Sequence, residues 1–230
     1  NSGFTPKYFE LKLSSSRTDL PEPAKFKAKD GSEVHVFGTI DRVDTLRIND
    51  ELFVRVVDYK TGKKDFSPSD IDKGKNLQMF LYLKSVVDTQ NREFLTDLGA
   101  VPGKKPVPAG VVYVKTEVGD ITVNSPDEAV VSKAIENAQK RKGMILAEPE
   151  VLNATGAKFA PVRIINSGAI HGSDKAKAFT RDWWDEKMLT ISDVVTGIAS
   201  GIKKGVISAP EGGCDACTWC KFKPICRSNK

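Results

Sequence analysis

Residues 38–60 read GTIDRVDTLRINDELFVRVVDYK, and this stretch decides the fold that we expect for the chain. Both of its halves are rich in β-branched and apolar residues, which predicts two strands, over 33–48 and 52–59. Residues 49–51 (Asn-Asp-Glu) predict a turn between them. The two strands are therefore expected to pair as a β-hairpin.

Two acidic residues occupy unusual places in this hairpin. Asp41 lies near the middle of the first strand, and Asp58 follows two valines at the end of the second. Carboxylates are poor strand formers, and they are costly to bury unless they are paired or bind a cation. Because side chains alternate along a strand, Asp58 and Lys60 project from one face, and the hairpin can bring Asp41 close to Asp58.

The pair of carboxylates predicts a site for a hard divalent cation such as Mg²⁺, with Lys60 beside it. Such a cation lowers the pKa of a water and neutralises phosphate oxygens, while Lys60 can orient the water or stabilise negative charge. The competing interpretation is a surface ion pair between Asp58 and Lys60, since Asp-x-Lys is a common sequence.

Outside the hairpin, strand and helix patterns alternate. We expect an edge strand at 4–13, loops at 14–32, 61–69 and 91–109, a helix at 71–88, two strands within 110–124, a helix at 126–142 capped by Ser125, a hairpin at 159–171, and helices at 176–188 and 191–204. This order predicts a mixed α/β domain over residues 1–213. A cysteine-rich tail at 214–230 is expected to pack on the same domain.

Charge and composition narrow the function only slightly. The formal net charge of +5 and the pI of about 8.9 favour a polyanionic partner such as DNA or RNA. No apolar run approaches the roughly 20 residues of a membrane span, and no secretory signal is visible, so we expect a cytoplasmic protein without membrane contact. The first residue is Asn rather than Met, so we expect a piece of a longer protein. No G-x4-G-K-[ST] motif is present, so ATP hydrolysis by this chain is not expected.

All four cysteines lie in a short segment near the end, as Cys214-x2-Cys217-x2-Cys220-x5-Cys226. A disulfide framework would spread its cysteines along the chain, whereas a tight cluster is typical of a metal site in a reducing compartment. Four thiolates at this spacing fit either a 4Fe-4S cluster or zinc.

Three motifs in order resemble one nuclease family. Gly38-x-Ile40-Asp41-Arg42-Val43-Asp44, Asp58-Tyr59-Lys60-Thr61-Gly62 and Leu77-Gln78-Met79-Phe80-Leu81-Tyr82 agree in order and spacing over more than 40 residues. They resemble the PD-(D/E)XK nuclease superfamily, its RecB-like branch, and most closely the C-terminal nuclease domains of the AddB (RexB) subunits of bacterial ATP-dependent helicase–nucleases. The resemblance implies a restriction-endonuclease-like core, a mixed central sheet flanked by helices.

The resemblance also implies roles for individual residues. Asp41 and Asp58 would ligate Mg²⁺ with the main-chain carbonyl of Tyr59 as a third ligand, and Lys60 would be the catalytic lysine. Gln78 and Tyr82, four residues apart on one helix face, would lie towards the active site and the DNA backbone. Without the resemblance, amphipathic packing with Tyr82 in the core is the preferred interpretation of that pair.

Arg42 and Asp44 lie on the opposite face of their strand from Asp41. We interpret them as structural and expect an ion pair between them. The tail resembles the C-x2-C-x5-C ending of AddB-like proteins, which implies that Cys217, Cys220 and Cys226 hold a 4Fe-4S cluster. The family's fourth ligand lies upstream, so either Cys214 replaces it or the cluster can be absent from this chain.

The function implied by the resemblance is that of a Mg²⁺-dependent DNA exonuclease in double-strand break processing and recombinational repair. An AddA-like partner subunit would then drive unwinding with ATP, and this chain would cut the strand that ends 5′. Two alternatives remain. One is a free-standing RecB-like exonuclease such as those of CRISPR adaptation systems, and the other is a non-catalytic DNA-binding module held by an iron–sulfur cluster.

Overall fold

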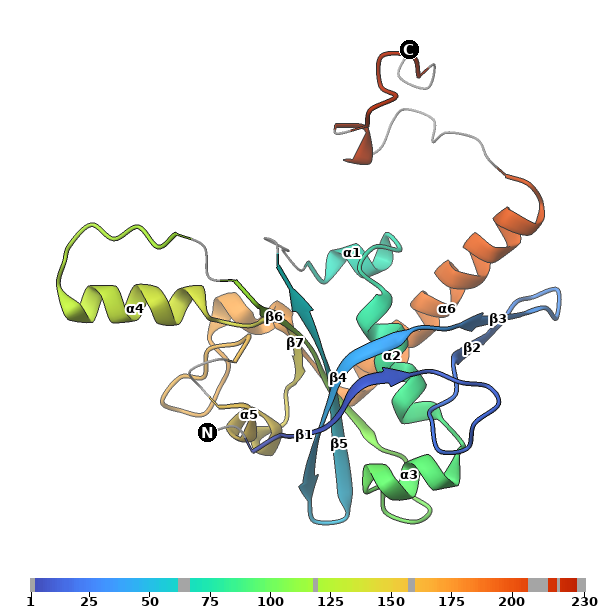
Figure 1. The fold of residues 1–230 in the computed structure, drawn as a ribbon, viewed down its shortest axis with the longest axis horizontal. Helices are drawn as coiled ribbons and strands as arrows, with labels where there is room; N and C mark the ends of the chain where they lie inside the picture. Colours follow the sequence, from blue (N-terminus) through green and yellow to red (C-terminus); the bar gives the residue numbers. More distant parts are fainter. Residues whose placement is uncertain are drawn as a thin grey trace.

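The structure is a computed structural model in which residues 3–61, 67–117, 120–156, 160–206, 215–218 and 220–226 are described. It is a mixed α/β fold built on a six-stranded sheet, as the strand and helix patterns predict (Figure 1). None of the described helices is both long and apolar enough to cross a membrane.

The central sheet runs in the order β1-β4-β5-β6-β7-β8. Its members are β1 (Thr5–Lys12), β4 (Thr39–Ile48), β5 (Glu51–Lys60), β6 (Val107–Lys115), β7 (Lys142–Leu146) and β8 (Ala178–Phe179). The β5–β6 and β7–β8 pairs are parallel, and the other three are antiparallel. A separate antiparallel pair is formed by β2 (Ala24–Lys27) and β3 (Glu33–Val36).

The helices lie around this sheet (Figure 1). They are α1 (Ser69–Asp72), α2 (Gln78–Asp88), α3 (Arg92–Leu98), α4 (Glu128–Ala138), α5 (Pro149–Thr155) and α6 (Arg181–Lys203), with short 3-10 turns at Gly172–Lys177 and Asp215–Thr218. The prediction of a single edge strand near the start is confirmed by β1, and the predicted β4–β5 hairpin is also present.

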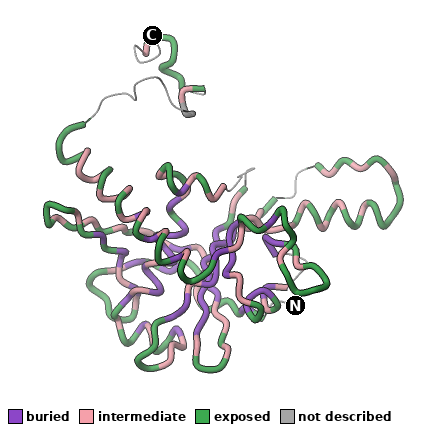
Figure 2. The backbone as a smooth tube through the Cα atoms, turned by 180° about the vertical axis from the view of Figure 1, so that it is seen from behind, coloured by how far each residue is buried: buried purple, intermediate pink, exposed green. Residues whose placement is uncertain are grey.

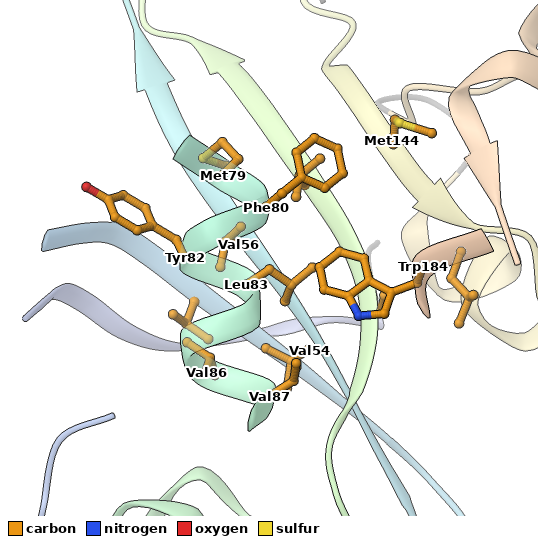
Figure 3. Close-up of a cluster of buried hydrophobic side chains, with 14 of the residues drawn as sticks. Val54, Val56, Met79, Phe80, Tyr82, Leu83, Val86, Val87, Met144 and Trp184 are labelled. Atoms are coloured by element: carbon orange, nitrogen blue, oxygen red, sulfur yellow. The ribbon is translucent and has the colours of Figure 1, made fainter. Parts of the chain in front are cut away.

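The core forms where α2 crosses β5 and β6 (Figures 2 and 3). In β5, all residues from Leu52 to Asp58 are buried, as expected for a strand with neighbours on both sides and a parallel partner. Phe80 and Leu83 of α2 are fully buried in the same cluster as Val54 and Val56 of β5. Each such side chain contributes roughly 1.5–3 kcal/mol by its removal from water. The packing of α2 therefore fixes which face of β5 carries Val56 and, two residues on, Asp58.

The predicted single helix over 71–88 is wrong, because the chain forms α1 and α2 with a break between them. Gly74 and Asn76 both have positive φ, of 72° and 56°, which no right-handed helix accommodates. The backbone amide of Gly74 bonds to the carbonyl of Ile71 and closes α1. The Gly and Asn of this segment were the available sequence signals for a helix end.

The predicted strand over 33–48 is also divided, into β3 and β4, and the predicted loop over 14–32 contains β2. The division falls at Phe37–Gly38, where the backbone lies against Tyr82 of α2. A Cβ atom on Gly38 would come within 2.3 Å of the Tyr82 hydroxyl and 2.7 Å of its ring. Apolar alternation continues through this point, and the isolated Gly38 was the one available sign of the division.

Between residues 91 and 142 three predictions need correction. The expected loop contains α3 and the start of β6, and within 110–124 the described residues form only one strand, β6. Gly119, the centre of the predicted turn, lies outside the described residues. The helix near 126–142 starts at Glu128, and its cap is Asp127 rather than Ser125, since the Asp127 side chain accepts from the amides of Ala129 and Val130.

Beyond residue 142 the sheet gains two strands that the sequence patterns did not reveal, β7 and β8. The predicted hairpin at 159–171 is reduced, in its described part, to one antiparallel bridge between Ile164 and Ile170. The two predicted helices at 176–188 and 191–204 are one continuous helix, α6. Gly205 follows it with φ of 68°, as expected for a residue that ends a helix.

Candidate active site

The β4–β5 register brings the two predicted acids to the same end of the hairpin. Its last pairs are Val43 with Val56 and Arg42 with Val57, and Asp41 and Asp58 are the next residue on each strand. Continuing this register by one residue puts Asp41 opposite Asp58. Directly opposite residues of an antiparallel pair project from the same face. That face is the one covered by α2, since Val56 packs there and Asp58 follows it by two residues (Figure 3).

The polar contacts of this site are short and few. Asp41 Oδ2 accepts a hydrogen bond of 2.9 Å from the main-chain amide of Tyr59. Lys60 Nζ lies 2.6 Å from Asp58 Oδ2, and the Asp58 side chain is only 8% exposed. Among the described residues, no hydrogen bond of acceptable geometry reaches Asp58 Oδ2, so this buried oxygen has the ammonium as its neighbour and lone pairs left over. A buried carboxylate in this condition is a suitable ligand for a cation.

Tyr113 of β6 is a site neighbour that the sequence patterns did not single out. The parallel β5–β6 register pairs Asp58 with Tyr113 and Lys60 with Lys115. Tyr113 is buried, and that burial together with the negative charge of Asp58 raises its pKa. The one available signal was that Tyr113 follows two valines in a strand that ends at Lys115. The sequence did not show which residue of another strand would lie beside Tyr113.

Gln78 and Tyr82 share a face of α2 as expected, and Gln78 Nε2 donates to the Tyr82 hydroxyl over 3.2 Å. Gln78 is exposed, whereas Tyr82 is buried and belongs to the hydrophobic core. Tyr82 packs against Gly38, three residues before Asp41. In the described part of the chain, no hydrogen bond joins either residue to the carboxylates or the lysine of the hairpin. Packing accounts for the position of Tyr82, and the roles of Gln78 and Tyr82 in the active site stay predictions.

On the opposite face of the sheet, Asp44 is completely buried between two arginines. Arg42 Nε lies 2.5 Å from Asp44 Oδ1 and Arg42 Nη2 lies 2.9 Å from Oδ2, which confirms the expected ion pair. Arg55, only 1% exposed, adds Nε at 2.9 Å and Nη2 at 2.8 Å to Asp44 Oδ2. Burial lowers the pKa of Arg55 to about 10 against the attraction of Asp44, so Arg55 is charged at neutral pH.

The third guanidinium nitrogen of Arg42 extends this network to the end of β5. Arg42 Nη1 donates to the Tyr59 hydroxyl over 3.1 Å. The hydrogen bonds to Asp44 and then the one to Tyr59 raise the pKa of Arg42 despite partial burial. Arg141 lies nearby, and its pKa is lowered by burial and by the positive charge of Arg42. The guanidinium of Arg55 lies over the ring of Phe4, 4.2 Å from its centroid.

The donor set of the site fits Mg²⁺. Within the described ranges no group of three or more His, Cys, Asp or Glu side chains is arranged to hold a metal ion. Mg²⁺ needs no such group, because it is commonly held by one or two carboxylates and keeps several waters. Asp41 and Asp58 supply two carboxylates on one face, and Asp58 Oδ2 retains lone pairs for a ligand.

The cysteine tail is described only in part. Cys217 and Cys226 are half-buried and Cys220 is exposed, and these three are not gathered into a metal-holding group. Cys214 lies outside the described residues. Short turns order the last described segment, where the Cys226 amide bonds to the carbonyl of Phe222 over 2.9 Å. The arrangement of the described thiols is not that of a formed cluster.

A family model described as the PD-(D/E)XK nuclease superfamily matches residues 2–227. The chain belongs to the PD-(D/E)XK nuclease superfamily. The resemblance carried by the three motifs is thereby confirmed, and the six-stranded sheet flanked by helices is that of a PD-(D/E)XK nuclease domain.

This PD-(D/E)XK domain is also similar to curated proteins, each named as the B-type subunit of an ATP-dependent helicase/deoxyribonuclease. The relative from Geobacillus thermodenitrificans is 30% identical over 98% of this chain and 20% of its own length. The relative from Clostridium novyi is 30% identical with the same coverage, and that from Alkaliphilus oremlandii is 26% identical over 91% of the chain and 18% of its own length. The chain thus spans about a fifth of the length of the curated relatives it matches.

Proposed function

We propose that this chain is the DNA-cutting domain of an AddB-type subunit, a Mg²⁺-dependent exonuclease that processes DNA ends for recombinational repair. The names of the relatives, which join a helicase to a deoxyribonuclease, favour this proposal over a free-standing exonuclease. They also suggest an AddA-like partner subunit that unwinds the duplex, and DNA as the substrate.

One observation carries the proposal. Asp41 and Asp58 are the first residues of β4 and β5 beyond the last pair of the hairpin, and the ammonium of Lys60 lies 2.6 Å from the Asp58 carboxylate. Two carboxylates on neighbouring strands repel each other unless a cation lies between them. A structural ion pair would need only Asp58 and Lys60, so Asp41 at the same end of the hairpin supports the catalytic interpretation.

The residues divide the chemistry between them. Asp41, Asp58 and the Tyr59 carbonyl would hold the cation, and the Tyr59 amide keeps Asp41 in place. When bound, Mg²⁺ supplies Lewis acidity to a water and to the phosphate. Lys60 orients the attacking water or stabilises the negative charge that develops on the phosphate oxygens.

Other residues of the domain serve the substrate and the structure. The Gln78 side chain is exposed and donates to the Tyr82 hydroxyl. In this proposal Gln78 would contact the DNA backbone, and Tyr82 would fix its position on α2. In the tail, Cys217, Cys220 and Cys226 would ligate a structural 4Fe-4S cluster once gathered around it, with Cys214 or a cysteine from elsewhere in the protein as the fourth ligand.

The test compares cleavage of linear DNA by the natural full-length protein and by its Asp58→Ala variant, with and without Mg²⁺. The matched control is Asp50→Ala, which removes an exposed carboxylate from the turn of the same hairpin. We expect Asp58→Ala to abolish Mg²⁺-dependent cleavage and to leave DNA binding intact, while Asp50→Ala cuts like the parent. Equal cleavage by the parent and Asp58→Ala would overturn the proposal. If the parent protein binds DNA but does not cleave it, the alternative of a non-catalytic DNA-binding module would be favoured.

A further inference from the structure

The network around Asp44 orients Arg42 with little freedom. Asp44 is fully buried and is itself held by Arg55. Arg42 uses Nε and Nη2 to bind both oxygens of Asp44, which is the two-point contact that a planar guanidinium makes with a carboxylate. Once two of its nitrogens are held, the direction of the third is determined by the plane of the group. That third nitrogen, Nη1, points to the hydroxyl of Tyr59.

Tyr59 connects the two faces of the sheet. Its side chain projects to the face that carries Arg42, because it lies one residue from Asp58 on the strand. Its main-chain amide nevertheless bonds to Asp41 Oδ2, on the catalytic face. The residue is 38% exposed and next to the last in β5, so core packing restrains it less than it restrains Val57.

We propose that Arg42 is a positioning residue of the nuclease site, which acts from the opposite face of the sheet through the Tyr59 hydroxyl. The bond from Arg42 holds Tyr59. The Tyr59 amide in turn holds Asp41, and the Tyr59 carbonyl would be a ligand of the cation. This inference rests on the proposed function for its consequence in metal binding. Its structural part, the restraint of the Tyr59 amide, is independent of that function.

The variants separate this role from a general loss of stability. Tyr59→Phe removes only the hydroxyl, Arg42→Met removes the donor, and the double variant removes both. Arg47→Met is the matched control, since Arg47 lies on the same strand and donates to the Gly99 carbonyl, far from Tyr59 in the strand register. Tyr59→Phe decides the question if Arg42→Met does not fold, because it leaves the buried ion pairs of Asp44 untouched.

Two measurements on the natural full-length protein read out the role. The first is hydrogen exchange of the β5 peptide that contains the Tyr59 amide, without metal. The second is Mn²⁺ binding followed by EPR, where the difference between the parent and Asp58→Ala defines the binding that belongs to this site. Neither measurement depends on DNA cleavage.

We expect Tyr59→Phe and Arg42→Met each to speed exchange of that peptide and to weaken Mn²⁺ binding by about fivefold, the effect of one hydrogen bond. The double variant is expected to match the more affected single variant, because both single changes break the same hydrogen bond, from Arg42 to the Tyr59 hydroxyl. Arg47→Met should behave like the parent.

Parental exchange and Mn²⁺ affinity in Tyr59→Phe would overturn the inference, and so would effects of the two single changes that add in the double variant. Equal Mn²⁺ binding by the parent and Asp58→Ala would instead overturn the proposed metal site. In that case the exchange measurement would still decide whether Arg42 restrains the Tyr59 amide.

Discussion

The main-chain amide of Tyr59 donates a 2.9 Å hydrogen bond to Asp41 Oδ2, so the end of β5 is bonded to a side chain of β4. This bond occupies one oxygen of Asp41 and directs the carboxylate towards the neighbouring strand. Asp58 follows the last residue of β5 that pairs with β4. Asp41 is therefore held by the backbone of β5, and this restraint would lower the cost of assembling the proposed cation site.

Replacing Lys60 with Ala is expected to slow cleavage on the order of a hundredfold or more while leaving the fold intact, because it removes the positive charge beside Asp58. Single-turnover cleavage at saturating Mg²⁺ measures the effect. Lys115→Ala is the control, since Lys115 is the register partner of Lys60 on β6, and it should cut at near the parental rate. A Lys60→Ala protein as fast as its parent would remove Lys60 from the mechanism.

The natural full-length protein, purified without oxygen, is expected to be brown and to contain iron rather than zinc. The reason is the C-x2-C-x5-C ending made by Cys217, Cys220 and Cys226. Elemental analysis and the visible absorption spectrum measure it. Stoichiometric zinc would contradict the cluster assignment, and retention of iron in Cys214→Ser would show that the fourth ligand lies elsewhere.

Asp44→Asn is expected to lower the free energy of unfolding by about 3–5 kcal/mol, because it leaves the charge of buried Arg55 uncompensated. Urea unfolding followed by circular dichroism measures the loss. Asp50→Asn breaks an exposed pair with Lys104, at 3.5 Å, and should cost less than about 1 kcal/mol. Equal costs for the two changes would mean that burial does not set the strength of the Asp44 network.

Gly38→Ala is expected to destabilise the domain by about 1–3 kcal/mol, since its Cβ would lie 2.3 Å from the Tyr82 hydroxyl. Thermal or urea unfolding measures it, and combination with Tyr82→Ala should remove the part of the cost due to that contact. Gly197→Ala is the control. Gly197 lies in α6 with open space around its Cβ position, so alanine there should stabilise by up to about 1 kcal/mol.

Because of Asp174, the stability of the fold is expected to fall at acidic pH. Burial opposes its ionisation, but hydrogen bonds from Arg163 and the charge of Lys177 prevail and lower its pKa from 3.8 to about 2. Because the folded pKa is depressed, this carboxylate contributes stability above about pH 4 and loses it as the pH falls towards 2.

Replacing Asp174 with Asn should lower stability at pH 7 by at most about 2.5 kcal/mol. It should also flatten the fall in stability between about pH 4 and 2. Urea midpoints measured across that range for parent and variant provide the test. An unchanged slope in the variant would mean that other carboxylates cause the acid sensitivity.

The sequence by itself determined the hairpin and the acids on it. Strand alternation has a period of two and the turn at Asn49 is short, so the hairpin register that brings Asp41 and Asp58 to the same end follows from residues close together in the chain. The ion pair of Arg42 with Asp44 followed in the same way, because side chains two residues apart on a strand project from the same face.

Tertiary structure alone decided which other residues complete the site. Tyr113 is the register partner of Asp58 because β6 pairs in parallel with β5. The break at Gly38 exists because Tyr82 of α2 packs there. Parallel pairing and helix packing join segments that are far apart in the chain. The local sequence of one segment does not indicate which distant segment it will contact.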